Sequence, residues 1–151
     1  HDLQSALIVG RILAYAQGFE ILAAGSKEFN WSLDFARIAE IWRAGCIIRL
    51  AMLDDIATAF RSAHLAGHLA LSAHFIPVLT AHIAGLRRVV SAAALKGLLM
   101  PALAAALSWF DMIRQERGAS DLIQAQRDYF GAHSFERVDA EGSHHGPWYA
   151  G

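Results

Sequence analysis

The chain has 151 residues and a formal net charge of −1, with 13 Lys and Arg against 14 Asp and Glu. This length is enough for one compact domain with a hydrophobic core, and the balanced charge gives no basic surface for nucleic acid. The single cysteine, Cys46, excludes an internal disulfide framework and fits a reducing compartment. We therefore predict a cytoplasmic protein that binds no nucleic acid.

The first residue and the apolar content suggest that this chain is part of a longer polypeptide or of an assembly. Hydrophobic residues make up 55% of the chain, whereas about 45–50% is ordinary for globular domains. The chain begins at His1 rather than at methionine, and its first segment lacks the basic region and cleavage site of a secretory signal. We expect a piece of a longer polypeptide, with apolar surface that another element or subunit covers.

Apolar residues recur at helical spacing along the first half of the chain. They predict one long helix from Leu3 to about Glu28. Its expected apolar stripe contains Leu7, Ile8, Ile12, Tyr15, Phe19 and Leu22. Ser32 is then the predicted N-cap of a helical segment over residues 33–60, with Gly45 positioned to divide it into two helices.

The second half predicts a looser connection over residues 61–72 and then two helices, from His74 to Lys96 and from Pro101 to Arg117. Pro101 suits the first turn of a helix, because its missing N–H needs no partner there. Ser120 and Asp121 begin a last helix.

Residues 134–151 contain turn formers and no periodicity, so they predict an irregular segment. Strand signals are almost absent, since Ala and Leu dominate and alternation of β-branched residues does not persist. The predicted fold is all-α and bundle-like, with five to six helices. We expect an all-α domain over residues 1–131 and a C-terminal tail over residues 132–151.

Residues 89–110 contain one charge, Lys96, and approach the roughly 20 residues that span a bilayer. Lys96 falls near the middle of this segment, where a charge is costly in lipid, and Pro101 restarts the helix close by. A buried pair of helices is the better interpretation, and we expect no membrane contact.

Histidines raise a second alternative. His64 and His68 lie at the i, i+4 spacing of zinc ligands, and His74 and His82 follow. The segment lacks the glutamate of the HExxH motif, and Gly67 weakens the required helix. We expect solvent-facing histidines and no metal site, and the lone Cys46 is expected to pack as a small hydrophobe. A glycine-rich phosphate loop, a GxSxG motif and a paired-carboxylate site are also missing, so we assign no catalytic residue to this chain.

The stretch LIQAQRDYFGAH, residues 122–133, concentrates polar side chains in an apolar sequence. Arg127 and His133 are six residues apart, which is roughly 600° of rotation on a helix, so a turn is needed for them to share a target. Gly131 is the candidate for that turn, because glycine adopts the left-handed conformation. Arg127 either forms a surface ion pair with Asp128 or Asp121, or clamps an anion together with His133. The residue types alone leave both interpretations open.

The longer segment LIQAQRDYFGAHSFE closely resembles the C-terminal motif of the 6-phosphogluconate dehydrogenase family. Three further segments are similar to family segments in the same order: ILAYAQGF, IWRAGCIIR and MPALAAALSWFD. The ending HHGPW also resembles the end of the family's sequences. Two segments depart from the family pattern, LDFARIAEIW and RSAHLAGHLALSAHF, so the packing of the second and third helices can differ.

The resemblance implies an enzyme that oxidises 6-phosphogluconate with NADP and releases carbon dioxide and ribulose 5-phosphate. It also implies that NADP is bound mainly by a domain absent from this chain, and that the catalytic lysine and glutamate precede His1. Arg127 falls on the family's arginine that binds the substrate phosphate, and His133 on the histidine beside it. Both would serve the active site of the partner subunit in a homodimer. The alternatives are a helical dimerisation module with no chemistry of its own and a histidine-coordinated metal carrier.

Overall fold

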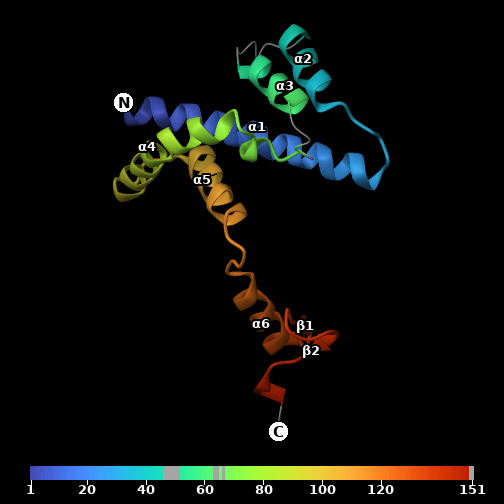
Figure 1. The fold of residues 1–151 in the computed structure, drawn as a ribbon. Coiled ribbons are helices and arrows are strands. Elements are labelled where there is room, and N and C mark those ends of the chain that lie inside the picture. The colour runs from blue at the N-terminus through green and yellow to red at the C-terminus, as the bar shows by residue number, and fades with distance from the viewer. Residues whose placement is uncertain (46–51, 63–64, 66, 150–151) are drawn as a thin grey trace. The chain divides into compact units, whose positions relative to one another are not determined.

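The computed structural model describes residues 1–45, 52–62, 65 and 67–149 (Figure 1). It divides into two compact units, His1–Phe110 and Asp111–Gly151, which we describe one at a time. The described residues form six α-helices and a sheet of two very short strands, which confirms the predicted all-α class. Cys46 and His64 lie outside the described residues.

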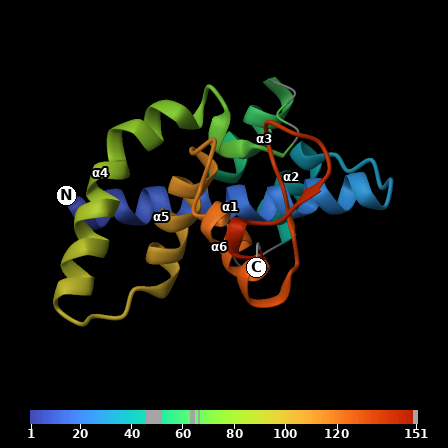
Figure 2. The ribbon, with the colours of Figure 1, turned by 90° about the horizontal axis from the view of Figure 1, so that it is seen from below.

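Helix α1 (Asp2–Glu28) is the central helix of the first unit (Figure 2). Its buried side chains recur three or four residues apart, and they include Ala6, Val9, Ile12, Leu13, Ala16 and Phe19. The predicted stripe was right at Ile12 and Phe19 but wrong at Leu7, which is exposed. The buried face instead runs through small residues such as Ala6 and Ala16, which let neighbouring helices approach closely.

Helix α4 (Phe75–Leu95) packs against the N-terminal half of α1. A Cβ on Gly85 would lie 2.6 Å from Ser5 Cβ, so the two backbones meet where only glycine fits. Ser5 Oγ also lies 2.9 Å from His82 Nδ1. The Arg88 guanidinium donates two parallel hydrogen bonds, of 2.8 and 2.7 Å, to the Asp2 carboxylate, so polar contacts flank the close approach.

Helix α5 (Pro101–Ile113) follows α4 after a turn in which Gly97 has a φ of 66°. Leu103 of α5 packs on Gly10 of α1. The turn confirms that residues 89–110 form parts of two helices rather than one span, but the predicted burial was wrong, since only Ala93 and Ala106 among them are buried in this chain. Helices α1 and α4 are themselves long and apolar enough to cross a membrane, by length and composition only. In the structure they pack against each other.

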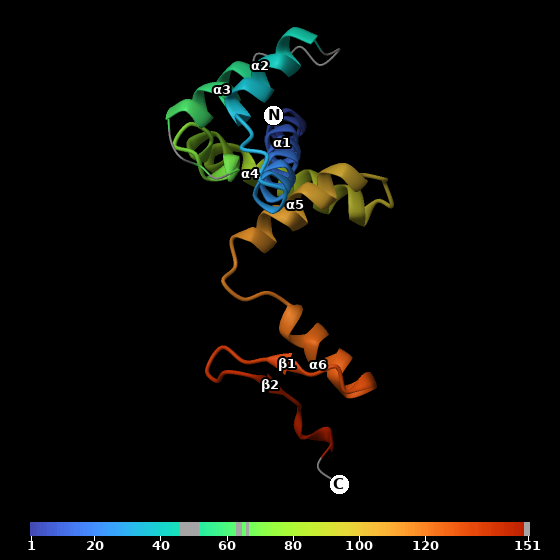
Figure 3. The ribbon, with the colours of Figure 1, turned by 90° about the vertical axis from the view of Figure 1, so that its right-hand side faces the viewer.

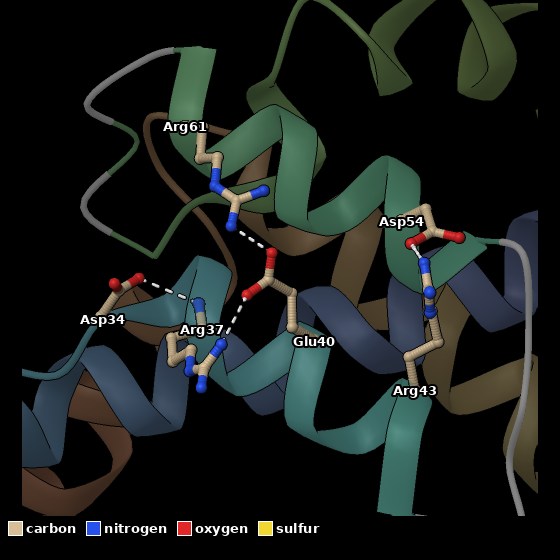
Figure 4. Close-up of polar contacts among 6 residues, drawn as sticks. All are labelled: Asp34, Arg37, Glu40, Arg43, Asp54 and Arg61. Carbon is tan, nitrogen blue, oxygen red and sulfur yellow. Dashed lines mark hydrogen bonds and ion pairs between the residues drawn. The ribbon is translucent and has the colours of Figure 1, made fainter.

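Helices α2 (Phe35–Gly45) and α3 (Met52–Ser62) lie side by side. As Figure 4 shows, Glu40 accepts hydrogen bonds from Arg61 across the pair and from Arg37 on its own helix, and Arg43 pairs with Asp54. The Arg61–Glu40 and Arg43–Asp54 contacts join α2 to α3 on the exposed face of the pair. On its inner face, the buried Phe19 ring of α1 lies 4.8 Å from Phe60, between ring centroids, and it also packs against Phe35 and Trp42.

Two predicted helix boundaries were wrong, the start of α2 and the end of α5. The N-cap of α2 is Asp34 rather than Ser32: Asp34 Oδ1 accepts a hydrogen bond of 2.9 Å from the Arg37 N–H, while Ser32 has a φ of 52°. Helix α5 ends at Ile113, four residues before the predicted end at Arg117. Residues 114–117 are polar and offer no side chain to bury, so the apolar period stops with Ile113.

The second unit consists of α6 (Ser120–Gly131), the strands β1 (Phe135–Glu136) and β2 (Ser143–His144), and the 3-10 turn Pro147–Tyr149 (Figure 3). The strands are antiparallel, with Phe135 opposite His144 and Glu136 opposite Ser143. The segment predicted as an irregular tail therefore contains a short hairpin that lies against α6.

Candidate functional site

Arg127 lies on α6 with its side chain exposed to solvent. Within the described residues it makes no hydrogen bond and no ion pair. The two carboxylates considered as its partners are engaged elsewhere: Asp121 lies 3.8 Å from Arg117, and Asp128 points into the unit. The surface ion pair is therefore not formed, and the guanidinium remains available to a ligand.

His133 follows in a tight turn at the end of α6, with its side chain also exposed. The turn residue was predicted wrongly. Gly131 stays helical, and the left-handed residue is Ala132, with a φ of 51° and a ψ of 37°. What Gly131 provides is space, because a Cβ there would lie 2.9 Å from both Cδ2 and Nε2 of the His133 ring. The imidazole thus folds back over the last turn of the helix.

Both neighbours of His133 have a positive φ, 51° at Ala132 and 60° at Ser134. This conformation costs roughly 1–2 kcal/mol for a residue with a side chain, so the surrounding contacts must hold it. Asp128 provides two of them. Its backbone oxygen accepts a hydrogen bond of 2.8 Å from the Ala132 N–H, and its Oδ1 accepts another of 2.8 Å from the Ser134 N–H.

Asp128 is fully buried and also binds the last part of the chain. His145 Nδ1 lies 2.6 Å from Oδ1, and Oδ2 accepts hydrogen bonds from the Gly146 N–H at 2.8 Å and from Trp148 Nε1 at 2.9 Å. Burial raises the pKa of the Asp128 carboxyl, but these hydrogen bonds together outweigh that effect and lower the pKa to about 2. The carboxylate is therefore ionised at neutral pH although no solvent reaches it.

The importance of Asp128 was missed by the sequence analysis, which treated it as a possible surface partner of Arg127. One general signal existed, because an Asp side chain can accept hydrogen bonds from nearby backbone N–H groups. The other partners, His145, Gly146 and Trp148, are 17 to 20 residues away in a segment without periodicity. Local spacing does not reveal contacts of that kind.

A separate pocket of about 290 Å³ lies between α6 and the hairpin. Its lining includes Arg117, Gln124, Phe135, Arg137 and Asp139. The Arg137 guanidinium donates two hydrogen bonds, of 2.8 and 2.5 Å, to Asp139, and this pairing lowers the pKa of the Asp139 carboxyl to about 2. The pocket's arginines are thus paired with its own carboxylates, and neither Arg127 nor His133 lines it.

The candidate metal ligands among the histidines are not brought together. His68 contacts Glu20 at 3.0 Å, His74 lies 3.5 Å from Asp55, and His82 contacts Ser5. No group of three or more His, Cys, Asp or Glu side chains in the described part of the chain could hold a metal ion. The sequence also contains no GxGxxG segment for a dinucleotide.

Comparisons with known proteins agree on one family. The family model for the 6-phosphogluconate dehydrogenase C-terminal domain matches residues 1–148. The chain is 43% identical over 147 residues to the decarboxylating 6-phosphogluconate dehydrogenase of Lactococcus lactis subsp. lactis (strain IL1403), a match that covers 97% of the chain and 31% of the relative. The corresponding enzyme of Treponema pallidum (strain Nichols) is 46% identical over 138 residues, covering 91% and 28%.

Among solved structures, the chain is similar to 6-phosphogluconate dehydrogenase of Plasmodium falciparum, which was determined in its apo form and in complex with its cofactor NADP+ and with its substrate 6-phosphogluconate. The TM-score is 0.91 at 39% identity, and the match covers 97% of this chain and 32% of that one. The chain spans about a third of the length of these relatives. It belongs to the family of 6-phosphogluconate dehydrogenase C-terminal domains.

Proposed function

We propose that this chain acts as the C-terminal helical part of an enzyme that decarboxylates 6-phosphogluconate to ribulose 5-phosphate with NADP, and that Arg127 and His133 bind the substrate phosphate. The observation that carries this proposal is the state of Arg127. It is exposed and unpaired within the described residues, and it sits six residues before an imidazole held by a fixed turn.

The chemistry of the pair suits a phosphate. A guanidinium presents a planar fork of N–H donors that matches two phosphate oxygens, and the imidazole adds a donor whose charge depends on pH. The carbon atoms that react in 6-phosphogluconate are remote from its phosphate. This chain would therefore bind and orient the substrate, while the catalytic lysine and glutamate and most of the NADP site would lie in another part of the enzyme.

A homodimer follows from the same proposal. Many large apolar side chains are exposed in the chain taken alone, and they include Ile21, Leu95, Leu98, Leu99, Leu122 and Phe130. Exposed apolar surface of this extent marks contact surfaces in proteins. We propose that part of it is covered by a second copy, that Arg127 and His133 complete the active site of that partner subunit, and that the dimer is cytoplasmic.

A helical dimerisation module without activity is the second candidate. The same exposed apolar residues support it, and it requires no ligand for Arg127. The two candidates differ in what Arg127 does, so they are separated by one substitution in the longer enzyme of which this chain is a part.

In that enzyme, Arg127→Ala is expected to raise the KM for 6-phosphogluconate much more than it lowers kcat. A charge-assisted, bidentate contact contributes about 1.5–3 kcal/mol, so kcat/KM should fall on the order of ten- to a hundredfold. Arg127→Lys should recover only part of the loss, because a lysine lacks the fork. Lys96→Ala is the matched control, since it removes an exposed cation outside the motif. A KM for 6-phosphogluconate that stays at the wild-type value in Arg127→Ala would favour the inactive module.

A further inference from the structure

Asp128 accepts hydrogen bonds from the residues on both sides of His133, one through its backbone oxygen and one through its side chain. Ala132 is tied to the backbone oxygen of Asp128 and Ser134 to its carboxylate, each at 2.8 Å. Asp128 is also the residue that directly follows Arg127 on α6. One residue is therefore bonded to the two neighbours of His133 and covalently joined to Arg127.

The same carboxylate receives the end of the chain. His145 shares Oδ1 with the Ser134 N–H, while Gly146 and Trp148 both donate to Oδ2. Each carboxylate oxygen thus has two donors, which fills its usual capacity as an acceptor. Residues that are far from Arg127 in sequence are bonded to the atoms that set the turn at His133.

From this geometry we propose that Asp128 is a positioning residue, which sets the spacing of Arg127 and His133 and links it to the docking of His145 and Trp148. Asp128 itself does not touch the phosphate, because its side chain is fully buried and both oxygens are occupied. Its effect passes through the two exposed side chains. This inference rests on the proposed function, in which those side chains bind the substrate phosphate.

The positioning role predicts a selective defect. Asp128→Asn keeps the size of the side chain but replaces one acceptor oxygen with an NH₂ group that faces donors, so one or two of the four donors lose their acceptor. In the full-length enzyme, the KM for 6-phosphogluconate should rise on the order of tenfold, while kcat and the KM for NADP change less than about twofold. Trp148→Phe removes a single donor and keeps a ring, so it should raise the same KM by a smaller factor. Trp31→Phe, at an exposed tryptophan stacked on Phe29, should leave it unchanged.

A double-mutant test separates positioning from general support of the fold. In an Arg127→Ala, His133→Ala background nothing remains to be positioned, so adding Asp128→Asn should raise the KM less than about twofold further. An undiminished tenfold effect in that background, or a wild-type KM in Asp128→Asn alone, overturns the positioning role. If Asp128→Asn does not fold, Trp148→Phe carries the same comparison in both backgrounds. If the Arg127→Ala, His133→Ala enzyme itself keeps the wild-type KM, the phosphate role fails and the positioning role fails with it.

Discussion

The imidazole of His133 lies directly against Gly131, where an added Cβ would be 2.9 Å from ring atoms Cδ2 and Nε2. A contact this short is not tolerated by a real Cβ, so either the ring or the backbone must move. The glycine therefore serves the orientation of His133 rather than the conformation of the turn, which Ala132 provides.

Gly131→Ala should displace the His133 ring and raise the KM for 6-phosphogluconate in the full-length enzyme. The expected rise is severalfold and smaller than that of Arg127→Ala, because the guanidinium stays in place. Gly118→Ala, in the same unit, is the matched control. Its added Cβ would meet no close neighbour, since the nearest atom, Ser120 Oγ, would be 4.0 Å away. Equal KM values in the two variants would contradict a role of Gly131 in orienting His133.

The lowered pKa of Asp128 predicts that the hydrogen bonds to its carboxylate are lost at low pH. The pKa is about 2 in the folded chain, against about 3.9 for an aspartate in an unfolded chain. A lowered pKa contributes stability that is fully present above about pH 4 and is lost as the pH falls toward 2. Protection of the Ser134 and Gly146 amides from hydrogen exchange should hold between pH 7 and pH 5 and fall between about pH 4 and pH 2.

In Asp128→Asn this acid-dependent loss of protection should disappear, because the side chain no longer titrates. Protection that already falls between pH 7 and pH 5 in the wild-type chain would mean that another group controls the docking of the last residues. Protection that persists unchanged to pH 2 would contradict the importance of the ionised carboxylate.

The close approach of α1 and α4 can be tested at Gly85. Gly85→Ala brings a methyl group to 2.6 Å from Ser5 Cβ and 3.3 Å from the backbone oxygen of Asp2, so the helices must separate. The free energy of unfolding should fall by about 1–3 kcal/mol. Gly18→Ala, in α1 with nothing within 4 Å of the added Cβ, should instead raise it by up to about 1 kcal/mol. Urea unfolding followed by circular dichroism measures both, and a neutral Gly85→Ala would refute the tight contact.

The aromatic centre of the first unit depends on Phe19. Its ring is fully buried and touches aromatic rings of α2 and α3, so Phe19→Ala should lower the free energy of unfolding by about 3–5 kcal/mol. The exposed Phe29, which stacks on Trp31, provides the comparison, and Phe29→Ala should cost about 0.5 kcal/mol or less. Similar costs for the two substitutions would argue against the described core.

The helices were predictable because their signals are local. The apolar period identified α1, α4 and α5, Pro101 identified the break before α5, and Ser120 and Asp121 identified the start of α6. The N-cap at Asp34 was missed because Ser32 and Asp34 are both good caps, and the choice between them depends on the backbone at Ser32, which has a positive φ. The hairpin was missed because strands of two residues show no alternation.

The sequence suggested the two exposed residues of the candidate site and not the buried one. Arg127 and His133 stand out in the motif because their side chains can bind an anion. Asp128 instead accepts hydrogen bonds from donors at residues 145–148. That role arises only when the hairpin folds back on α6. The spacing of residues in the sequence does not predict this contact between the hairpin and α6, so the burial of the Asp128 carboxylate is visible only in the folded unit.

The most direct test of the account is a mixed dimer of the full-length enzyme, in which one subunit carries Arg127→Ala and the other has its catalytic lysine replaced. If Arg127 binds the phosphate in the partner's active site, both lesions fall in one site and the other site is intact. Separately tagged subunits, purified as the heterodimer and assayed at a 6-phosphogluconate concentration near the wild-type KM, should then keep about half of the wild-type activity. An activity as low as that of the two parent homodimers would show that each site contains one lesion, and it would contradict the shared phosphate site.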